Sequence, residues 1–418
     1  MNILMVTNTY LPIVGGLELS IQSFTAEYRK RGHRVKIIAP EFDNSPQDAD
    51  VIRVSALKNF NGSKYSIKLP MPVFFVKALG GFKPDIIHTH HPFLLGDTAL
   101  RLAYAHNVPL VFTHHSLYEE NIHWMPGATE ALKKFIIALS TGYANFCDTV
   151  IAPSESVAEM IKEHGVKTPI EVIPTGLHLN QYRGTSENFK KEKQIPEKDF
   201  VVGYVGRLAE EKNLPFLMRA TASFLQKEKK ALFLVVGSGP MEEAIATHFK
   251  DLNLEKQLRF AGEMKGAKLI EAYQAIDVFA FASQSETQGM VLNEAMAAGT
   301  PVVGVDAPGV RDIVIDKVNG RLVSSENEEE FAQALSWVYD RSPAQRIKLA
   351  DGAKETAKKY SVELSASKAL KVYESLKTEE TARHRKLKKK DLFKFLQHVN
   401  AEWDLFSNFA KATMDAFQ

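Results

Sequence analysis

Segments with the character of buried strands alternate with helical segments along almost the whole chain, and this alternation is the strongest constraint on its fold. Strands that alternate with helices form parallel sheets covered by helices. In the first half the expected strands are residues 3–7, 35–39, 86–89, 110–113, 149–152 and 171–173. In the second half they are residues 201–205, 232–236, 258–261, 278–282, 301–305 and 321–323. The sequence therefore predicts an α/β protein with two Rossmann-like parallel sheets.

Length and composition predict where the two sheets separate. A chain of 418 residues is too long for one ordinary hydrophobic core. Residues 181–199 are polar and rich in lysine, so we expect a linker there between domains at 1–180 and 200–361. Ligands of such sheets bind beyond the carboxyl ends of the strands. The residues that follow the strands are therefore the first candidates for a functional site.

Charge, cysteine content and hydropathy narrow the class of protein. The formal net charge of +2 gives no indication of a nucleic-acid partner. The single cysteine, Cys147, lies among apolar residues and is expected in the core, which fits a reducing compartment. The apolar start is too short for a signal peptide, and no run approaches the length of a membrane-spanning helix. We expect a cytoplasmic protein whose membrane contact, where there is one, is peripheral.

Two glutamates flank a predicted helix in the second half. Glu286 lies just before the helix expected at residues 289–298, and Glu294 lies about one turn inside it. A helix start attracts anions, because its free N–H groups and its dipole favour negative charge. Carboxylates beside such a site suit the hydroxyl groups of a sugar that carries a phosphate. The alternative is a solvated loop acid and a simple match to the helix dipole.

Two cations lie in the loop after the strand at residues 201–205. Arg207 and Lys212 are positioned to converge on one diphosphate, Arg207 as a planar fork and Lys212 as a point charge. The alternative is a surface loop in which they pair with Glu210 and Glu211. This loop and the paired glutamates together favour a nucleotide-sugar site.

Glycine pairs follow the first expected strand of the first half and the second expected strand of the second half. Gly15 and Gly16 would let the backbone approach a diphosphate or a sugar closely. Gly237 and Gly239 invite a dinucleotide interpretation. The third glycine of that motif is missing and a proline follows, so a dehydrogenase is not expected.

These motifs, in their order and spacing, resemble those of the retaining glycosyltransferases of family 4. The resemblance covers about residues 1–375 and includes the Glu-x7-Glu motif, the Gly-Arg-x4-Lys loop and both glycine loops. It implies a GT-B fold, in which two Rossmann-like domains face a cleft. It also implies that a last helix at residues 362–377 crosses back onto the N-terminal, acceptor-side domain, while the C-terminal domain binds the nucleotide sugar.

The resemblance assigns roles to individual residues. The catalytic residues it implies are His115, Arg207, Lys212 and Glu286. The donor-binding residues are Gly15, Gly16, Gly237, Gly239, Met264, Gly289, Met290, Val291 and Glu294. The acceptor-side candidates are His90, His114 and Tyr118. Because cations and a helix start would stabilise the leaving diphosphate, the resemblance implies neither a metal nor another cofactor.

The histidine content raises the alternative of a metal site. Histidines cluster at positions 88, 90, 91, 114, 115 and 123, and imidazole is a common metal ligand. No cysteine or ordered carboxylate spacing accompanies them. Asp48 and Asp50 imitate a metal-binding Asp-x-Asp motif but lie in a polar loop, so we expect no metal.

The segments around His91, His115 and Glu286 look most like bacterial diacylglycerol glucosyltransferases, which are peripheral membrane enzymes that use UDP-glucose. Residues 69–82 would then form either a lipid-facing surface or an ordinary buried helix. Two alternatives stay open at this point. One is a glycosyltransferase with a soluble sugar or metabolite as acceptor, and the other is a non-catalytic scaffold that binds nucleotide sugars.

The extension at residues 378–418 has no place in the two-sheet plan. It begins with a basic cluster between Arg383 and Lys390, which an apolar stripe at helical spacing follows. One interpretation is a basic amphipathic helix on an anionic membrane surface. The other is a helix that packs against its own enzyme or a second subunit. The stripe consists of Leu392, Leu396, Val399, Trp403, Phe406, Phe409 and Phe417.

Overall fold

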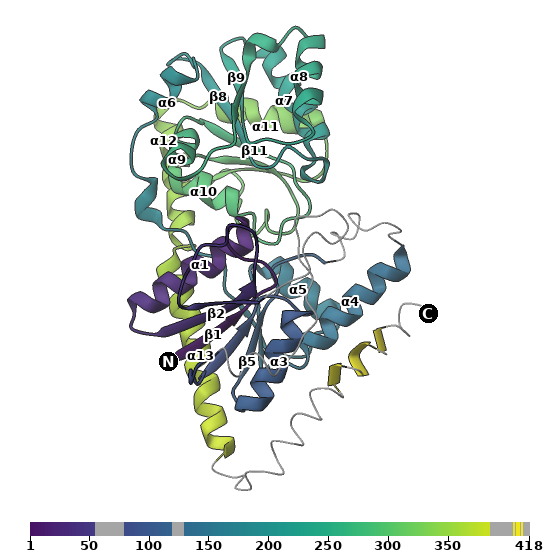
Figure 1. Ribbon diagram of the computed structural model, residues 1–418. Coiled ribbons are helices and arrows are strands. Elements are labelled where there is room, and N and C mark those ends of the chain that lie inside the picture. The colour runs from purple at the N-terminus through teal and green to yellow at the C-terminus, as the bar shows by residue number, and fades with distance from the viewer. Residues whose placement is uncertain (55–78, 119–128, 385–403, 406, 410, 413–418) are drawn as a thin grey trace. The chain divides into compact units, whose positions relative to one another are not determined.

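The structure is a computed structural model that describes residues 1–54, 79–118, 129–384, 404–405, 407–409 and 411–412. The chain divides into two compact units (Figure 1). Unit 1 comprises Met1–Gly176 and Val362–Gln418, and unit 2 comprises Leu177–Ser361. Each unit contains one parallel sheet, so the expectation of two Rossmann-like parallel sheets is confirmed.

The sheet of unit 1 has the strand order β3-β2-β1-β4-β5-β6-β7 among the described residues. The order reverses between β1 and β4, which makes this the topological switch point where ligands of such sheets bind. The strands are β1 (Asn2–Val6), β2 (Arg34–Pro40), β3 (Val51–Val54), β4 (Ile86–Thr89), β5 (Leu110–Thr113), β6 (Thr149–Ala152) and β7 (Ile170–Val172). The helices are α1 (Gly16–Lys30), α3 (Leu95–His106), α4 (Glu130–Ala144), α5 (Glu155–Glu163) and α13 (Val362–His384).

Alternate residues of the strands in unit 1 face two separate hydrophobic cores. Ile3 and Met5 of β1 belong to the core that contains residues of α1 and α13, whereas Leu4 and Val6 belong to the core with residues of α3 and α5. This two-sided burial explains why the strands read as continuous apolar runs.

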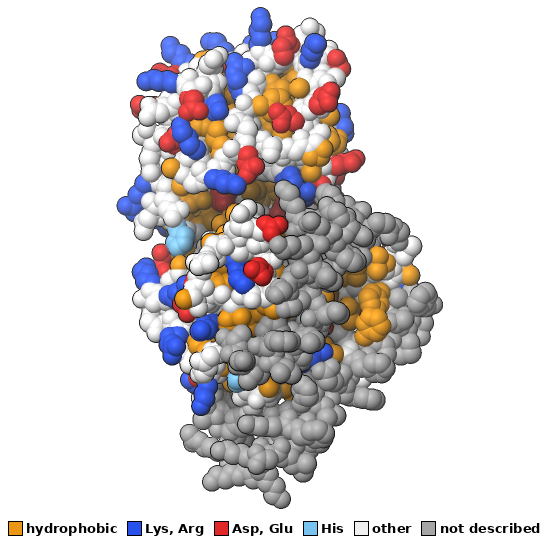
Figure 2. Space-filling model, viewed as in Figure 1, with side chains coloured by type: hydrophobic (Ala, Val, Ile, Leu, Met, Phe, Trp, Pro, Cys, Tyr) orange, Lys and Arg blue, Asp and Glu red, His pale blue; other side chains and the backbone are white. Residues whose placement is uncertain are grey.

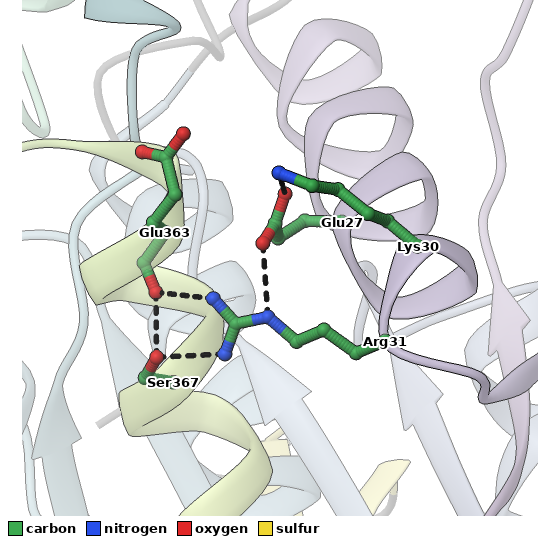
Figure 3. Close-up of polar contacts among 5 residues, drawn as sticks. All are labelled: Glu27, Lys30, Arg31, Glu363 and Ser367. Carbon is green, nitrogen blue, oxygen red and sulfur yellow. Dashed lines mark hydrogen bonds and ion pairs between the residues drawn. The ribbon is translucent and has the colours of Figure 1, made fainter.

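Helix α13 is fastened to α1 by Arg31, which directly follows α1. Figure 3 shows its guanidinium between the two helices. It donates to Glu27 Oε1 at 2.9 Å, to Ser367 Oγ at 2.7 Å and to the Glu363 carbonyl at 2.8 Å. The expected last helix therefore does pack on the N-terminal sheet domain, and it extends beyond residue 377 to His384.

A buried hydroxyl also connects α13 to the sheet. Tyr373 Oη lies 2.6 Å from His88 Nδ1 on β4 and accepts from Tyr28 Oη at 3.4 Å. Burial lowers the pKa of His88 to about 3, so the ring is neutral and accepts this hydrogen bond at Nδ1.

We expect Tyr373→Phe to destabilise unit 1 by about 1–3 kcal/mol, because the buried Nδ1 of His88 then has no donor. For a unit of this size, calorimetry of the full chain should show a melting temperature lower by about 2–4 °C per kcal/mol. Tyr28→Phe is the matched control, since its hydroxyl bond is longer and its loss should cost less. Equal melting temperatures for wild type and Tyr373→Phe would contradict this role.

Unit 2 contains a sheet with the strand order β10-β9-β8-β11-β12-β13. Its switch point lies between β8 and β11, where the order reverses. The strands are β8 (Phe200–Val205), β9 (Ala231–Val236), β10 (Leu258–Gly262), β11 (Val278–Phe281), β12 (Val302–Val305) and β13 (Gly320–Val323). The α-helices are α6 (Glu187–Glu192), α7 (Leu214–Lys227), α8 (Glu242–Asp251), α9 (Gly266–Gln274), α10 (Met290–Ala298), α11 (Glu328–Tyr339) and α12 (Pro343–Lys358), and the short 3-10 helices are Leu179–Tyr182, Glu210–Lys212 and Glu255–Gln257.

The structure bears on two segments, the expected linker at residues 181–199 and the expected lipid-facing or buried helix at residues 69–82. Residues 181–199 belong to unit 2 and contain α6, whose Phe189 is fully buried in the core. Phe189 and Ile195, which is also buried in this core, anchor the lysine-rich stretch. Residues 69–78 of the expected lipid-facing or buried helix lie outside the described residues, while Leu79 and Phe82 are buried.

The described residues of the C-terminal extension pack against unit 1. Asp404 accepts a hydrogen bond from Tyr104 of α3 at 2.8 Å, and Asn408 donates to the Leu139 carbonyl of α4 at 2.9 Å. The ring of Phe409 meets Phe135 edge-on at 5.5 Å. For these residues, the structure agrees with the interpretation that the extension packs against its own chain. The side chains of the basic cluster and most of the apolar stripe lie outside the described residues.

Candidate functional site

The loops that follow β8 and β11 meet at the switch point of unit 2. Lys212 Nζ, from the β8 loop, lies 2.7 Å from Glu286 Oε1, from the β11 loop. Both side chains are about four-fifths covered, with exposed fractions of 24% and 19%. Arg207 forms an ion pair with Glu211 in the same β8 loop. The structure thus brings Arg207, Lys212 and Glu286 to one edge of the sheet, with each cation paired to a carboxylate.

The second glutamate of the motif sits on α10 and is held by a tyrosine. Gly289 adopts a left-handed conformation (φ 66°) that starts α10, and Glu294 accepts a hydrogen bond from Tyr273 Oη of α9 at 2.6 Å. Burial raises the pKa of the Glu294 carboxyl, and the hydrogen bond from Tyr273 partly offsets this effect. Glu294 is therefore fixed in orientation and ready to accept a second hydrogen bond.

Gly237 and Gly239 allow the β8 and β9 loops to lie backbone to backbone. Both have positive φ, and a Cβ on either would collide with a carbonyl of the β8 loop, that of Gly206 or of Leu208 respectively. Leu208 N donates to the Ser238 carbonyl at 2.9 Å, which joins the two loops. The glycines therefore shape the loop that carries Arg207. The close approach of the two backbones requires glycine at both positions even without a ligand.

The remaining expected donor-side residues border the same edge. Met264 follows β10 and packs half-buried against the unit 2 core. Met290 begins α10, and Val291 in its first turn packs against the same core. A helix start leaves N–H groups that can serve as hydrogen-bond donors for an anion, and in α10 the Leu292 amide is already bonded to the Gly289 carbonyl at 2.9 Å. Acidic and basic side chains are interspersed over the visible face of unit 2 (Figure 2).

The expected histidines of unit 1 meet at its own switch point. His90 follows β4, His115 follows β5, and His90 Nδ1 lies 2.9 Å from His115 Nε2. Burial and the neighbouring imidazoles lower the pKa of both rings well below the usual value. The two residues therefore form a neutral, hydrogen-bonded pair.

His114 and Tyr118 occupy a separate apolar contact. The His114 ring is buried and meets Tyr118 edge-on at 5.1 Å, and Tyr118 meets Phe93 at 5.2 Å. Burial lowers the pKa of His114 to about 4. The structure thus distinguishes the two neighbouring histidines, because His115 bonds to His90 whereas His114 packs among aromatic rings.

The glycine loop of unit 1 carries an unexpected carboxylate. Gly15 precedes α1, and the buried Glu18 in the first turn accepts a hydrogen bond from Thr9 Oγ1 at 2.5 Å. A Cβ at Gly15 would meet the Glu18 carboxylate at 2.8 Å. A carboxylate here repels phosphate and accepts hydrogen bonds from hydroxyl groups. The loop of Gly15 and Gly16 therefore favours a sugar over a diphosphate.

Other candidates from the sequence have structural partners. Asp50 and Asp48 both form ion pairs with Arg29, at 3.3 and 3.9 Å, and Cys147 is buried with a raised thiol pKa. Within the described ranges, histidine, cysteine and acidic side chains form no group of three that could hold a metal ion. In those same ranges no helix has the length and apolar character required to cross a bilayer.

Sequence reasoning missed Tyr273 and Glu18 as site residues. Tyr273 lies on α9, distant in sequence from Glu294, and a tyrosine on an amphipathic helix carries no local signal of such a contact. Glu18 resembles an ordinary acidic residue in the first turn of a helix. The sequence also allows Arg207 to pair with Glu211 as an alternative to diphosphate binding, and the structure contains that pair.

Two family models together match most of the chain. The model of Glycosyltransferase Family 4 matches residues 14–181, and that of Glycosyl transferases group 1 matches residues 185–360. An alpha-monoglucosyldiacylglycerol synthase from Streptococcus pneumoniae is 29% identical over 341 residues, which cover 78% of this chain and 76% of the relative. A D-inositol 3-phosphate glycosyltransferase from Corynebacterium diphtheriae is 29% identical over 385 residues, which cover 86% and 89%.

A solved structure has the same fold. Anabaena Alr3699/HepE, crystallised with UDP and glucose, matches with a TM-score of 0.71 and 21% identity, and the match covers 90% of this chain and 100% of that one. The GT-B fold expected from the sequence is confirmed by this similarity together with the two parallel sheets.

Proposed function

The chain belongs to glycosyltransferase family 4 and is a hexosyltransferase, and from this premise we propose that it transfers glucose, with retained configuration, from UDP-glucose to a lipid hydroxyl of the diacylglycerol type. The observation that carries the proposal is the set of ion pairs and hydrogen bonds at the switch point of unit 2. Lys212 pairs with Glu286 at 2.7 Å there, and Tyr273 orients Glu294 at 2.6 Å. This set supplies cations for a diphosphate and carboxylates for sugar hydroxyls.

The paired state of the cations suggests how the donor is recognised. A bound diphosphate would take Lys212 from Glu286 and Arg207 from Glu211, because a diphosphate carries more charge than one carboxylate. Glu286 would then be released to accept hydrogen bonds from the glucose hydroxyls, while Glu294 accepts those of the ribose. Lys212 thus couples the arrival of the phosphates to the availability of Glu286.

The same groups would promote cleavage of the bond between glucose and UDP. Negative charge builds on the leaving diphosphate in the transition state, and Arg207, Lys212 and the first-turn amides of α10 would stabilise it electrostatically. This proposal requires no metal, so turnover should persist in a chelator. Glu18 and His115 of unit 1 would bind hydroxyls of the acceptor.

The choice of acceptor rests on the relatives. The pneumococcal relative is a glucosyldiacylglycerol synthase, which favours a lipid hydroxyl. The corynebacterial relative is an inositol-phosphate glycosyltransferase, matched over a larger share of both chains, and it supports a soluble polyol as the second candidate. We favour the lipid because of the motif resemblance around His91, His115 and Glu286.

Product analysis distinguishes these candidates. Purified enzyme would be incubated with UDP-glucose, UDP-galactose, UDP-GlcNAc and GDP-mannose, each with diacylglycerol in mixed micelles or with inositol phosphate. We expect UDP-glucose and diacylglycerol to give an α-glucosyl lipid in chelator. Transfer to inositol phosphate alone would replace the lipid proposal, and a β-linked product would contradict retention.

The C-terminal extension would bring the enzyme to its lipid substrate through its basic cluster. Each basic residue near an anionic surface contributes about 1 kcal/mol, screened by salt. Replacing Lys389 and Lys390 together by Gln is therefore expected to cost about 2 kcal/mol and to weaken binding to phosphatidylglycerol vesicles by about thirtyfold at low salt, and by less at high salt. Sedimentation with anionic and neutral vesicles measures this. Wild-type protein that stays in the supernatant under all conditions would contradict the proposal.

A further inference from the structure

Three imidazoles form a buried row at the switch point of unit 1. The rings of His88 and His90 lie 4.3 Å apart between centroids with an interplanar angle of 32°, and those of His90 and His115 lie 5.1 Å apart at 29°. His88 and His90 are almost fully buried, whereas His115 is partly exposed. The row therefore leads from the interior of the sheet to the candidate site.

The inner end of this row has a defined hydrogen-bond direction. Tyr28 Oη donates to Tyr373 Oη, which leaves the Tyr373 proton for His88 Nδ1. A neutral imidazole that accepts at one nitrogen donates at the other. His88 Nε2–H therefore donates to Thr113 Oγ1, which lies 2.6 Å away, and the Thr113 proton is left to point elsewhere.

A small cavity with several polar groups in a mostly apolar lining lies where that proton can go. It has a volume of about 10 Å³, and its lining includes His88, His90, Thr113, Ser20 and Thr175. This is about the volume that one water molecule requires, and buried water typically satisfies polar groups that lack protein partners. His90 Nε2 is such a group, because it is buried without a hydrogen-bond partner among the described residues.

The direction of the bond between His90 and His115 follows from this arrangement. A water molecule accepts two hydrogen bonds, and two donors compete for the one in this cavity: Thr113 and Ser20, whose Oγ already accepts from Thr175 Oγ1 at 3.0 Å. If His90 carried its proton on Nε2, it would be a third donor without an acceptor. If the proton is on Nδ1 instead, the bare Nε2 accepts from the cavity water, and every donor that faces the cavity meets an acceptor. The second arrangement avoids the cost of a buried, unsatisfied donor.

We propose that His90 is a positioning residue whose Nδ1–H donates to His115 Nε2. This hydrogen bond holds His115 as the tautomer that carries its proton on Nδ1. The Tyr373–His88–Thr113 network and one buried water determine the direction of the bond. His115 then presents an N–H donor rather than a bare nitrogen. A donor suits the oxygen of a sugar or acceptor hydroxyl. The role of this N–H in transfer rests on the proposed function, but the tautomer itself does not.

The tautomer can be measured by two-bond proton–nitrogen NMR on the full-length protein labelled with ¹⁵N-histidine and free of substrate, with His115→Gln used to assign the signals. We expect His115 to show the pattern of a neutral ring protonated at Nδ1. In His90→Leu this pattern should shift toward the Nε2–H form or a mixture. An Nε2–H pattern for His115 in the wild type overturns the proposal, whether or not the enzyme transfers glucose.

Two matched pairs of variants separate positioning from packing. His90→Asn keeps an amide N–H near the position of Nδ1 and should preserve the tautomer, whereas His90→Leu should not. Thr113→Ser keeps the hydroxyl that points into the cavity, whereas Thr113→Val removes it with little change in volume. If His90→Leu and Thr113→Val both leave the His115 pattern unchanged, the proposed direction is wrong.

Steady-state kinetics of glucose transfer from UDP-glucose provide the second readout. If His115 carries its ring proton on the wrong nitrogen, the chemical step is affected. His90→Leu should therefore lower kcat by about tenfold, while KM for the donor stays within about twofold. His90→Asn should recover most of kcat. An equal loss in Asn and Leu variants, or a loss confined to KM, would contradict a positioning role through His115.

Discussion

Replacing Lys212 by alanine is expected to lower turnover by about 10²–10³-fold, the usual cost of losing one group that stabilises transition-state charge. Lys212 Nζ is the cation that links the β8 loop to Glu286 across the switch point of unit 2. Its loss removes charge where the diphosphate departs and also leaves Glu286 without its partner. UDP affinity should fall less than turnover, because the proposed contacts of Glu294 with the ribose still hold the nucleotide, whereas the departing diphosphate loses a cation in the transition state.

The measurement is kcat with saturating UDP-glucose, together with calorimetry of UDP binding. Lys358→Ala is a suitable control, because that lysine is 63% exposed in an ordinary ion pair with Glu355 on α12. The control should leave kcat unchanged. Turnover of Lys212→Ala within a few-fold of the wild type would refute the catalytic assignment of this lysine.

Glu294→Ala is expected to weaken UDP binding by about tenfold or more, which corresponds to the 1–3 kcal/mol cost of removing one partner from a buried polar contact. The carboxylate is half-buried and already fixed by Tyr273, so the ribose hydroxyls meet an acceptor in place. After substitution, both the ribose and Tyr273 Oη lose that acceptor.

Glu286→Ala is the informative comparison for this prediction. Its carboxylate pairs with Lys212 before the donor binds, and partly exposed pairs contribute at most about 1 kcal/mol. UDP affinity should therefore change little in Glu286→Ala, while transfer from intact UDP-glucose falls. Equal losses of UDP affinity in both variants by titration calorimetry would contradict the division of roles between the two glutamates.

The sheets could be predicted because their strands are buried on both faces. The residues of β1 form a continuous apolar run, since Ile3 and Leu4 face different cores. The strand β3 was missed because it is a short edge strand of four residues that includes Arg53. Four residues interrupted by an arginine, next to a polar loop, give too short a pattern to distinguish a strand from a loop.

The candidate site could be predicted where its residues lie in loops at the carboxyl ends of neighbouring strands. The positions of Lys212 and Glu286 followed from loops at the ends of neighbouring parallel strands. The contacts of Glu294 with Tyr273 and of His90 with His115 depend on how helices and strands pack, and no local pattern encodes them. The division of His114 and His115 between an aromatic contact and the site likewise depends on the direction of each side chain after β5.

The most direct test of the proposed donor site is a crystal structure of the protein with UDP. We predict that Lys212 Nζ leaves Glu286 and contacts the diphosphate, that Arg207 leaves Glu211 for the same group, and that Glu294 accepts hydrogen bonds from the ribose while it keeps that of Tyr273. UDP bound elsewhere, with the Lys212–Glu286 pair intact and Glu294 bonded to Tyr273 alone, would contradict the account.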